Sequence, residues 1–343
     1  MDRDGEGAMH PAFLGIITII VGVGGCLAYF YGSNLFLDKV LYPPKGPNAG
    51  RNINRANQIR PWLFLLPAIL ALGLYLAYPV FATLRLSFME RGPGGVTEFV
   101  GFANYTQMFA EPKFREAMIN NVLWLVFVPA AATSFGLLAA QLTDRLSWGN
   151  IAKSIIFMPM AISFVGAAVI FKLIYEARPE DVAQIGILNH LYLTFGGDTP
   201  QQWLQIPFWN NFFLMAVLVW IQTGFAMVIL SAALRGIPEE TVEAAIIDGA
   251  NPFQIFFKIK IPQIMSTIVV VWTTITIATL KVFDIVFAMT NGQWETQVLA
   301  NYMYDKLFRA NDWGMGSASA MIIMLMVTPI LVWNVYNARK EMR

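Results

Sequence analysis

The pattern of apolar residues divides this chain into long hydrophobic segments separated by polar loops. A bilayer core of about 30 Å is crossed by about 20 apolar residues in helical conformation. Seven segments reach that length: 13–36, 62–84, 120–142, 153–176, 212–234, 267–290 and 317–336. The pattern therefore predicts an all-α, polytopic integral membrane protein with seven spans. An acidic start (Asp2, Asp4, Glu6) precedes the first span where a signal peptide has a basic leader, so we expect this span to be retained.

Composition agrees with a membrane protein and excludes several other classes. Hydrophobic residues make up 57% of the chain and charged residues 13%, against about 25% charged in an ordinary soluble domain. A net charge of +1 with scattered Lys and Arg gives no basic field, so no nucleic-acid partner is expected. The single cysteine, Cys26, allows no intrachain disulfide and is expected to serve packing.

Metal and nucleotide chemistry are not expected in this chain. His10 and His190 both lie outside the apolar segments, and no His-Glu-x-x-His pattern occurs. No glycine-rich phosphate loop ending in Lys-Ser or Lys-Thr is found either. We therefore expect no metal and no cofactor here, and any ATP that drives the protein must be bound by another chain.

Basic residues collect in alternate loops, which predicts the orientation of the chain in its membrane. They are Lys39, Lys45, Arg51, Arg55, Arg60, Arg145, Lys153, Arg235, Lys258, Lys260, Arg339, Lys340 and Arg343. Because basic loops stay in the cytoplasm, the N-terminus is expected outside and the C-terminus inside. The longer loops at 85–119, 177–211 and 291–316 then face outward, and their aromatic stretches read as interfacial belts.

A linker rich in Pro and Gly at residues 42–50 separates the first span from the other six. We therefore expect two parts: residues 1–61, an extra N-terminal transmembrane helix with a cytoplasmic linker, and residues 62–343, a six-span domain.

The polar segment at 235–266 lies between two apolar spans and carries the signals of two short helices. Pro238 suits the first turn of one helix, and the acidic residues after it complement the positive end of its dipole. Gly249 suits a left-handed helix terminator. Asn251, with Pro252 and Gln254 behind it, suits the cap of a second helix, which Pro262 is expected to end.

One face of this second helix is expected to carry an apolar ridge. Phe253, Phe256 and Phe257 stand at i, i+3 and i+4, which places them on one side of a helix. Such a ridge needs a groove, and a partner protein is one source of it. Periodicity alone leaves an equal alternative, in which the loop packs on its own bundle or on the lipid surface.

The same segment resembles the EAA loop of ABC importer permeases. The resemblance rests on Glu243-Ala244-Ala245, on Gly249 after three further residues, and on Ile259-x-Ile261-Pro262 nine residues later. It implies a six-helix type I ABC importer permease core in the inner membrane of a prokaryote. In this reading residues 235–266, named here the coupling loop, contact a cytoplasmic ATPase dimer through Glu243, Ala244, Ala245, Asp248, Gly249, Phe253, Phe256, Phe257 and Pro262.

Motifs over residues 60–340 resemble the sugar branch of these permeases, the maltose-transporter family. They include Phe99-Val-Gly-Phe-Ala-Asn-Tyr105, Met289-Thr-Asn-Gly292 and Gly316-Ser-Ala-Ser-Ala320. Gln293-Trp-Glu-Thr296 and Leu299-Ala-Asn-Tyr-Met303 resemble the narrower group of alpha-glucoside permeases. The resemblance implies a second, similar permease subunit, forming a heterodimer, and an extracytoplasmic solute-binding protein.

Sugars are bound by planar polar side chains and aromatic faces, so the solute path should carry Gln, Thr and aromatics. The resemblance places Phe225 and Thr279 at sugar-contacting positions, and Gln222 and Thr276 are further polar candidates on the same spans. Val282 stands where the family pattern has Asn. A Thr within a span also commonly bonds its own helix backbone, and that alternative stays open.

Lys281 and Asp284 are charged residues inside the sixth expected span, three positions apart and therefore on one helix face. Intramembrane charges are costly, so we expect them to pair or to face the bundle interior. They form either a gate element or a structural ion pair.

Two other classes of membrane protein compete with an ABC importer permease. A secondary transporter would couple to H⁺ or Na⁺ and would show inverted repeats and midplane acids, which we do not find. A membrane enzyme would need a catalytic cluster at membrane depth, where only Lys281 and Asp284 are available. The preferred interpretation is a permease subunit without enzymatic chemistry.

Overall fold

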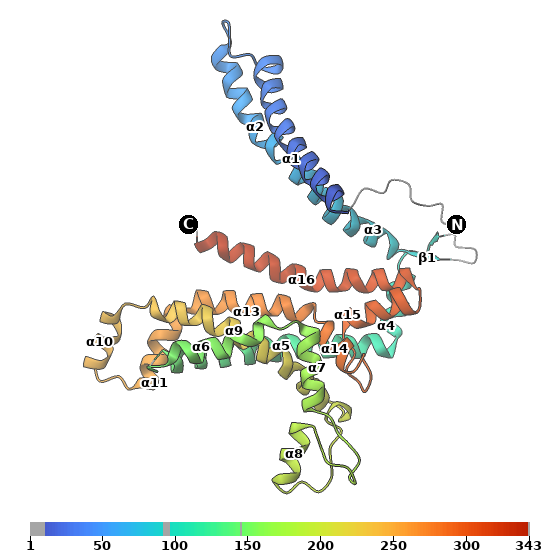
Figure 1. Ribbon diagram of the computed structural model, residues 1–343, viewed down its shortest axis with the longest axis vertical. Helices are drawn as coiled ribbons and strands as arrows, with labels where there is room; N and C mark the ends of the chain where they lie inside the picture. The colour runs from blue at the N-terminus through green and yellow to red at the C-terminus, as the bar shows by residue number, and fades with distance from the viewer. Residues whose placement is uncertain (1–10, 92–96, 145, 342–343) are drawn as a thin grey trace. The chain divides into compact units, whose positions relative to one another are not determined.

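The computed structural model describes residues 11–91, 97–144 and 146–341, and Figure 1 shows its helices. The acidic start at Asp2, Asp4 and Glu6 lies outside the described residues, and so do His10, Arg145 and Arg343, which the sequence analysis also used. The chain forms two compact units, Met1–Ala82 and Thr83–Arg343, and each is described by itself.

The first unit is a helical hairpin. Its elements are α1 (Pro11–Phe36), the π-helical turn η1 (Leu37–Leu41), α2 (Ala49–Leu72), the π-helical turn η2 (Gly73–Ala77) and the start of α3 (Tyr78–Leu86). Tyr29 Oη donates to Leu63 O at 2.7 Å, and the rings of Phe30 and Phe64 meet edge to face at 5.4 Å. Only residues 42–48 of the expected linker are non-helical, because α2 begins at Ala49, well before the expected span.

The second unit contains a small antiparallel hairpin followed by the main helical bundle. The hairpin pairs β1 (Met89–Arg91) with β2 (Thr97–Phe99), with Met89 opposite Phe99. The helices are α4 (Ala103–Ala110), α5 (Pro112–Thr143), α6 (Gly149–Phe157), η3 (Met158–Ala161), α7 (Phe164–Ile174), α8 (Ile187–Thr194), η4 (Trp203–Gln205), α9 (Trp209–Arg235), α10 (Glu239–Ile247), α11 (Pro252–Gln254), η5 (Ile255–Lys260), α12 (Ile261–Gln263), α13 (Met265–Leu280), α14 (Asp284–Met289), α15 (Leu299–Tyr304), η6 (Asp305–Arg309) and α16 (Trp313–Glu341).

The core of this unit lies where α5 crosses α9. Trp124 and Val128 of α5 and Leu214 and Met227 of α9 are fully buried in one cluster. Gly136 allows the closest approach, because a Cβ there would lie 2.4 Å from the Cβ of Ala226. A side chain at this position would force the two helices apart.

Five helices among the described residues are long and apolar enough to cross a membrane, or up to seven if two bent pairs each count as one span. The all-α prediction is confirmed, with one short hairpin besides. The five are Ala12–Leu41, Ala49–Leu86, Pro112–Thr143, Trp209–Arg235 and Trp313–Trp333. The bent pairs are Gly149–Ala161 with Phe164–Ile174, at 103°, and Pro252–Gln263 with Met265–Leu280, at 72°.

The fourth span expected at 153–176 is not one continuous helix, because the chain turns by 103° between α6 and α7. Pro159 lies in the 3₁₀ turn η3 and has no N–H to continue a helical ladder. Ser163 then starts α7 as an extended N-cap whose Oγ accepts from Gly166 N at 3.1 Å. Pro159 and Ser163 are both visible in the sequence, but a prediction based only on the length of the apolar segment does not use them.

The sixth expected span is also discontinuous. Pro262 does not end the preceding helix as expected, since the chain stays helical to Gln263 and bends at Ile264. At the far end α13 stops at Leu280 and α14 begins at Asp284, so the expected single helix through Lys281 and Asp284 is wrong.

Candidate coupling loop and solute cavity

The first helix of the coupling loop, α10, ends as its sequence predicts. Gly249 has φ +82°, in the left-handed region. Its N–H donates to Ile246 O at 3.0 Å, and Ala250 N donates to Ala245 O at 2.9 Å. These two bonds form a Schellman motif, which satisfies the last carbonyls of the helix. At the other end Pro238 is the N-cap, one position before the expected first turn.

The second helix begins with a complete capping box, also as predicted. Asn251 Oδ1 accepts from Gln254 N at 2.9 Å, and Gln254 Oε1 accepts from Asn251 N at 2.8 Å. The helix then continues as the π-helical segment η5. Because π geometry changes the angular spacing of side chains, the expected ridge is not uniform. Phe253 and Phe257 are 77% and 59% exposed, whereas Phe256 is half-buried against Phe257.

The loop presents an apolar surface that its own unit leaves uncovered. Ile247 is 84% exposed beside Phe253 and Phe257, and Glu243, Ala244, Asp248, Gly249 and Pro262 are exposed as well. Ala245 alone of the motif is buried, at 8% exposed. Figure 1 shows α10 and α11 at one end of the second unit, with α4 and α15 at the other.

A charged cluster, which the sequence analysis missed, holds the helix ends behind this loop. Lys153 of α6 and Arg235 of α9 both contact Asp144 Oδ1, which follows α5. Burial acts to raise the pKa of Asp144, but hydrogen bonds and charge from Lys153 and Arg235 outweigh it, so the pKa lies below its ordinary value. Lys260 Nζ also donates to Gln141 Oε1 at 3.3 Å, which ties η5 to α5.

A cavity of about 440 Å³ opens where the fourth span bends, and it is a candidate solute site because polar side chains from two spans line it. Gln222 of α9 and Asp284 of α14 both line it, together with Ser163 and Phe164 from the bend. The structure therefore brings Gln222 and Asp284 together although the sequence placed them in different roles. Lys281 is exposed, and no ion pair joins it to Asp284 in the part of the chain that the structure describes.

The other expected path residues do not line this cavity. Thr276 and Thr279 donate to the carbonyls of Trp272 and Ile275, at 2.7 and 2.8 Å, as threonines in spans commonly do. Thr279 is 1% exposed, and Phe225 is half-buried against the core. Val282 is buried next to the helix break.

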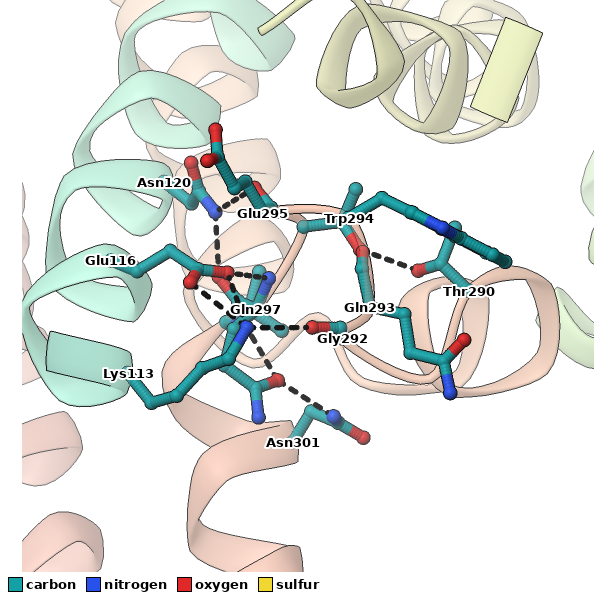
Figure 2. A network of polar contacts seen from close by, with 12 residues as sticks. Lys113, Glu116, Asn120, Thr290, Gly292, Gln293, Trp294, Glu295, Gln297 and Asn301 are labelled. Atoms are coloured by element: carbon teal, nitrogen blue, oxygen red, sulfur yellow. Dashed lines mark hydrogen bonds and ion pairs between the residues drawn. The ribbon is translucent and has the colours of Figure 1, made fainter. Parts of the chain in front are cut away.

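At the opposite end of the unit lies a segment with a strained backbone, named here loop 290–301, which includes the first three residues of α15. Asn291, Trp294 and Glu295 have φ values of 53°, 53° and 63°, although none is glycine. Asn120 Nδ2 donates to Glu295 O and Gln297 O at 2.9 and 2.8 Å (Figure 2). Buried donors of this kind compensate the cost of left-handed residues.

Further polar side chains fix the same loop. Glu116 Oε1 accepts from Gln297 N at 3.0 Å, and Lys113 bridges Glu116 and Gly292 O (Figure 2). Asn210 donates to Trp294 O, and Asn211 Nδ2 donates to Glu295 O at 3.2 Å. The sequence signal was the adjacent asparagine pairs, Asn120-Asn121 and Asn210-Asn211, at the start of apolar spans.

Comparison with known proteins identifies relatives along most of the chain. Residues 132–342 match the family described as "Binding-protein-dependent transport system inner membrane component". The alpha-glucoside transport system permease protein AglF of Rhizobium meliloti is 60% identical over 97% of this chain and 99% of its own. The osmoprotective compounds uptake permease protein GgtC of Synechocystis is 46% identical over 82% of this chain and 100% of its own.

Among solved structures, the fold is similar to a chain of a bacterial alginate ABC transporter. That structure is a complex with an alginate pentasaccharide-bound periplasmic protein. The TM-score is 0.69 at 20% identity, over 85% of this chain and 98% of the other. At this identity the likeness concerns the fold.

Proposed function

The chain belongs to the family of binding-protein-dependent transport system inner membrane components, and from this premise we propose that it is one of two permease subunits of an importer for neutral α-glucosides. The protein is thus a multi-pass inner-membrane permease and not an enzyme. Nothing in the comparisons supports a secondary transporter. The solute class rests on the 60% identity to an alpha-glucoside permease along nearly the whole chain.

The proposal that this chain couples to an ATPase rests on the exposed apolar surface of the coupling loop. Ile247, Phe253 and Phe257 are 84%, 77% and 59% exposed on a segment whose backbone bonds are already satisfied. A rigid, capped unit with uncovered aromatic side chains suits a preformed groove of a partner protein. We assign that groove to a cytoplasmic ATPase dimer, which binds the ATP.

Orientation follows from the same assignment. The coupling loop contains Arg235, Lys258 and Lys260, as the positive-inside rule expects of a cytoplasmic segment. The N-terminus then lies outside, the C-terminus in the cytoplasm, and loop 290–301 faces the extracytoplasmic binding protein.

Residues 1–61 are an addition to a six-span permease domain, residues 62–343. GgtC matches over its whole length while covering 82% of this chain, which favours an added segment here. The second permease subunit is a similar but different chain, so that the pair forms a heterodimer.

The solute path runs through the cavity at the bend. Gln222 offers an amide donor and acceptor, and Asp284 offers acceptor oxygens to sugar hydroxyls.

Reconstitution of the whole transporter, with the second permease, the ATPase and the binding protein, tests the coupling assignment. In proteoliposomes, Phe253→Ser with Phe257→Ser should lower maltose uptake roughly tenfold or more and release the ATPase from the purified complex. Phe99→Ser with Phe102→Ser removes two rings that are 75% and 69% exposed elsewhere in the chain, and should change neither. Full uptake and ATPase retention in the coupling-loop variant would refute the assignment.

The solute site is tested in the same vesicles. Gln222→Ala and Asp284→Asn should each lower uptake several-fold without releasing the ATPase, since each removes hydrogen bonds to the solute. Thr279→Val is the comparison, because its hydroxyl bonds Ile275 O. If Thr279→Val and Phe225→Ala abolish uptake while Gln222→Ala does not, the site lies at the positions expected from resemblance.

A further inference from the structure

A second cavity, of about 380 Å³, lies at the end of α7 away from the bend. Its lining combines Lys172 of α7, Glu176 two residues after α7, Gln202 and Gln205 from η4 and its flank, and Trp294 from loop 290–301. The volume falls within the range of about 300–1,000 Å³ for small-molecule sites. None of these residues belongs to the solute cavity at the bend or to the coupling loop.

The lining chemistry suits a neutral polyhydroxylated solute. Gln202 and Gln205 are exposed, and neither side-chain amide bonds another residue that the structure describes, so both are open to hydroxyl groups. Trp294, 42% exposed, supplies an aromatic face of the kind on which sugar rings stack. The cavity lining carries one ammonium group, on Lys172, and one carboxylate, on Glu176, whose Oε1 also accepts from Arg178 Nε at 3.3 Å, so it offers no unpaired carboxylate to a cation.

The cavity is built on fixed backbone. Asn189, fully buried, donates to Glu176 O and Gln201 O at 3.0 Å each, and its Oδ1 accepts from Gln201 N at 2.8 Å. This one side chain joins the end of α7 to the segment that carries Gln202. Trp294 has φ +53° and is held through its carbonyl by Asn210. A site whose walls are already ordered loses little entropy on binding.

The helix α7 connects this cavity to the solute cavity at the bend. Phe164 and Val165 at its start line the cavity at the bend, whereas Val169 and Lys172 line the second one. The eleven residues of α7 span roughly 16 Å at 1.5 Å per residue. A solute that leaves one cavity therefore needs to travel only about the length of α7 to reach the other.

We propose that this second cavity is an outer subsite that receives the α-glucoside before it enters the bundle. The inference rests on the proposed function and adds a first binding step on the extracytoplasmic side. Trp294 provides the stacking face, and Gln202, Gln205 and Glu176 hydrogen-bond the sugar hydroxyls. Release along α7 then delivers the solute to Gln222 and Asp284.

Photolabelling of the complete transporter in nanodiscs, without binding protein, tests this subsite. The probe is a maltose that carries a diazirine, and labelled peptides are located by mass spectrometry. Label is expected in peptides that contain residues 202–205 and Trp294, and unlabelled maltose should compete it away. Gln202→Ala with Gln205→Ala should lower this label roughly tenfold, since two hydrogen bonds to the solute are lost.

Gln201→Ala is the matched control, because this neighbouring amide bonds Thr199 and does not line the cavity. It should leave the label unchanged. Label confined to peptides around Ser163 and Gln222 refutes the outer subsite while leaving the proposed import function intact. Label at 202–205 that phosphatidylglycerol removes and maltose does not would identify a lipid headgroup instead, which also refutes it. No maltose label anywhere, together with no maltose uptake, refutes both proposals.

Discussion

The coupling loop and loop 290–301 lie at opposite ends of one unit and are stabilised in opposite ways. In the coupling loop, the bonds that fix the turn join residues three to five positions apart, such as Gly249 to Ile246 and Gln254 to Asn251. In loop 290–301, the bonds to Asn120 and Glu116 join residues 175 to 181 positions apart. The turn of the coupling loop is therefore held by its near neighbours, whereas loop 290–301 adds to its local bonds several bonds from side chains of α5 and α9.

This difference has a mechanical consequence. A segment held by its own bonds can move as a rigid body without losing them, which suits transmission of movement from an ATPase. Loop 290–301 cannot move away from α5 without exposing buried carbonyls of Glu295 and Gln297, which suits a fixed wall for a solute site. We therefore expect the coupling end to move and the opposite end to stay rigid during transport.

The largest expected effect is on sidedness, where labelling should be all or none. With Cys26 replaced by Ser, we expect Asp198→Cys to react with a membrane-impermeant maleimide in intact spheroplasts, because Asp198 is exposed near α8. Asp248→Cys, exposed on the coupling loop, should react only after the membrane is permeabilised. Labelling of both cysteines from outside would contradict the prediction that the two ends lie on opposite sides of the membrane.

The next effect is on coupling. Gly249→Val should abolish most ATPase co-purification and uptake, since a β-branched residue at φ +82° costs roughly 1–2 kcal/mol and redirects the second helix. Gly249→Asn is the matched variant, because Asn adopts the left-handed conformation more readily, and it should retain most activity. Membrane abundance should be normal for both. Equal activity of the Val and Asn variants would mean that the turn does not position the loop.

A pair of asparagine substitutions compares the two kinds of stabilisation directly. Asn120→Ala leaves two carbonyls of loop 290–301 without their donor, which costs about 1–3 kcal/mol. Asn251→Ala removes an exposed helix cap and costs about 1 kcal/mol. The apparent melting temperature of the purified complex should therefore fall further for Asn120→Ala. A larger fall for Asn251→Ala would show that the coupling loop is the more tightly integrated segment.

The same contrast explains which features the sequence could predict. Gly249 and the Asn251–Gln254 box act through near neighbours, so residue type and spacing were enough to predict their geometry. Apolar length likewise predicted the helical membrane fold. The left-handed backbone at Trp294 depends on Asn210, which is distant in sequence, and no local pattern encodes it.

The solute cavity was hidden for a related reason. Gln222 and Asp284 line one cavity because the fourth span bends at Pro159 and the helix breaks after Leu280. A reading based on uninterrupted spans places Asp284 beside Lys281, which the break prevents. To predict that cavity, one must know how the bend between α6 and α7 packs against α9 and α14. The periodicity of apolar residues within one segment does not give this information.

The smallest expected effect concerns the base of the coupling loop, where Asp144 joins α5, α6 and α9 through long-range contacts. Its pKa is lowered in the folded protein, so its carboxylate contributes stability above the unfolded-state pKa of about 3.9, and this contribution is lost as the pH falls through the folded-state pKa. Asp144→Asn should therefore lower the melting temperature near neutral pH, by the equivalent of about 0.5–1 kcal/mol for a partly exposed ion pair. The difference from wild type should shrink below about pH 4.

Asp198→Asn is the matched control for this measurement, because Asp198 is exposed and forms no ion pair with any residue that the structure describes. It should not change the melting temperature at either pH. A second readout separates stability from coupling: ATPase activity stimulated by the loaded binding protein should fall for Asp144→Asn, because the helix ends that support the coupling loop are held less firmly. A difference in melting temperature that does not change with pH would mean that Asp144 acts by packing and not by charge. The base of the coupling loop would then be stabilised by side-chain packing, as the bundle core is, and not by ion pairs.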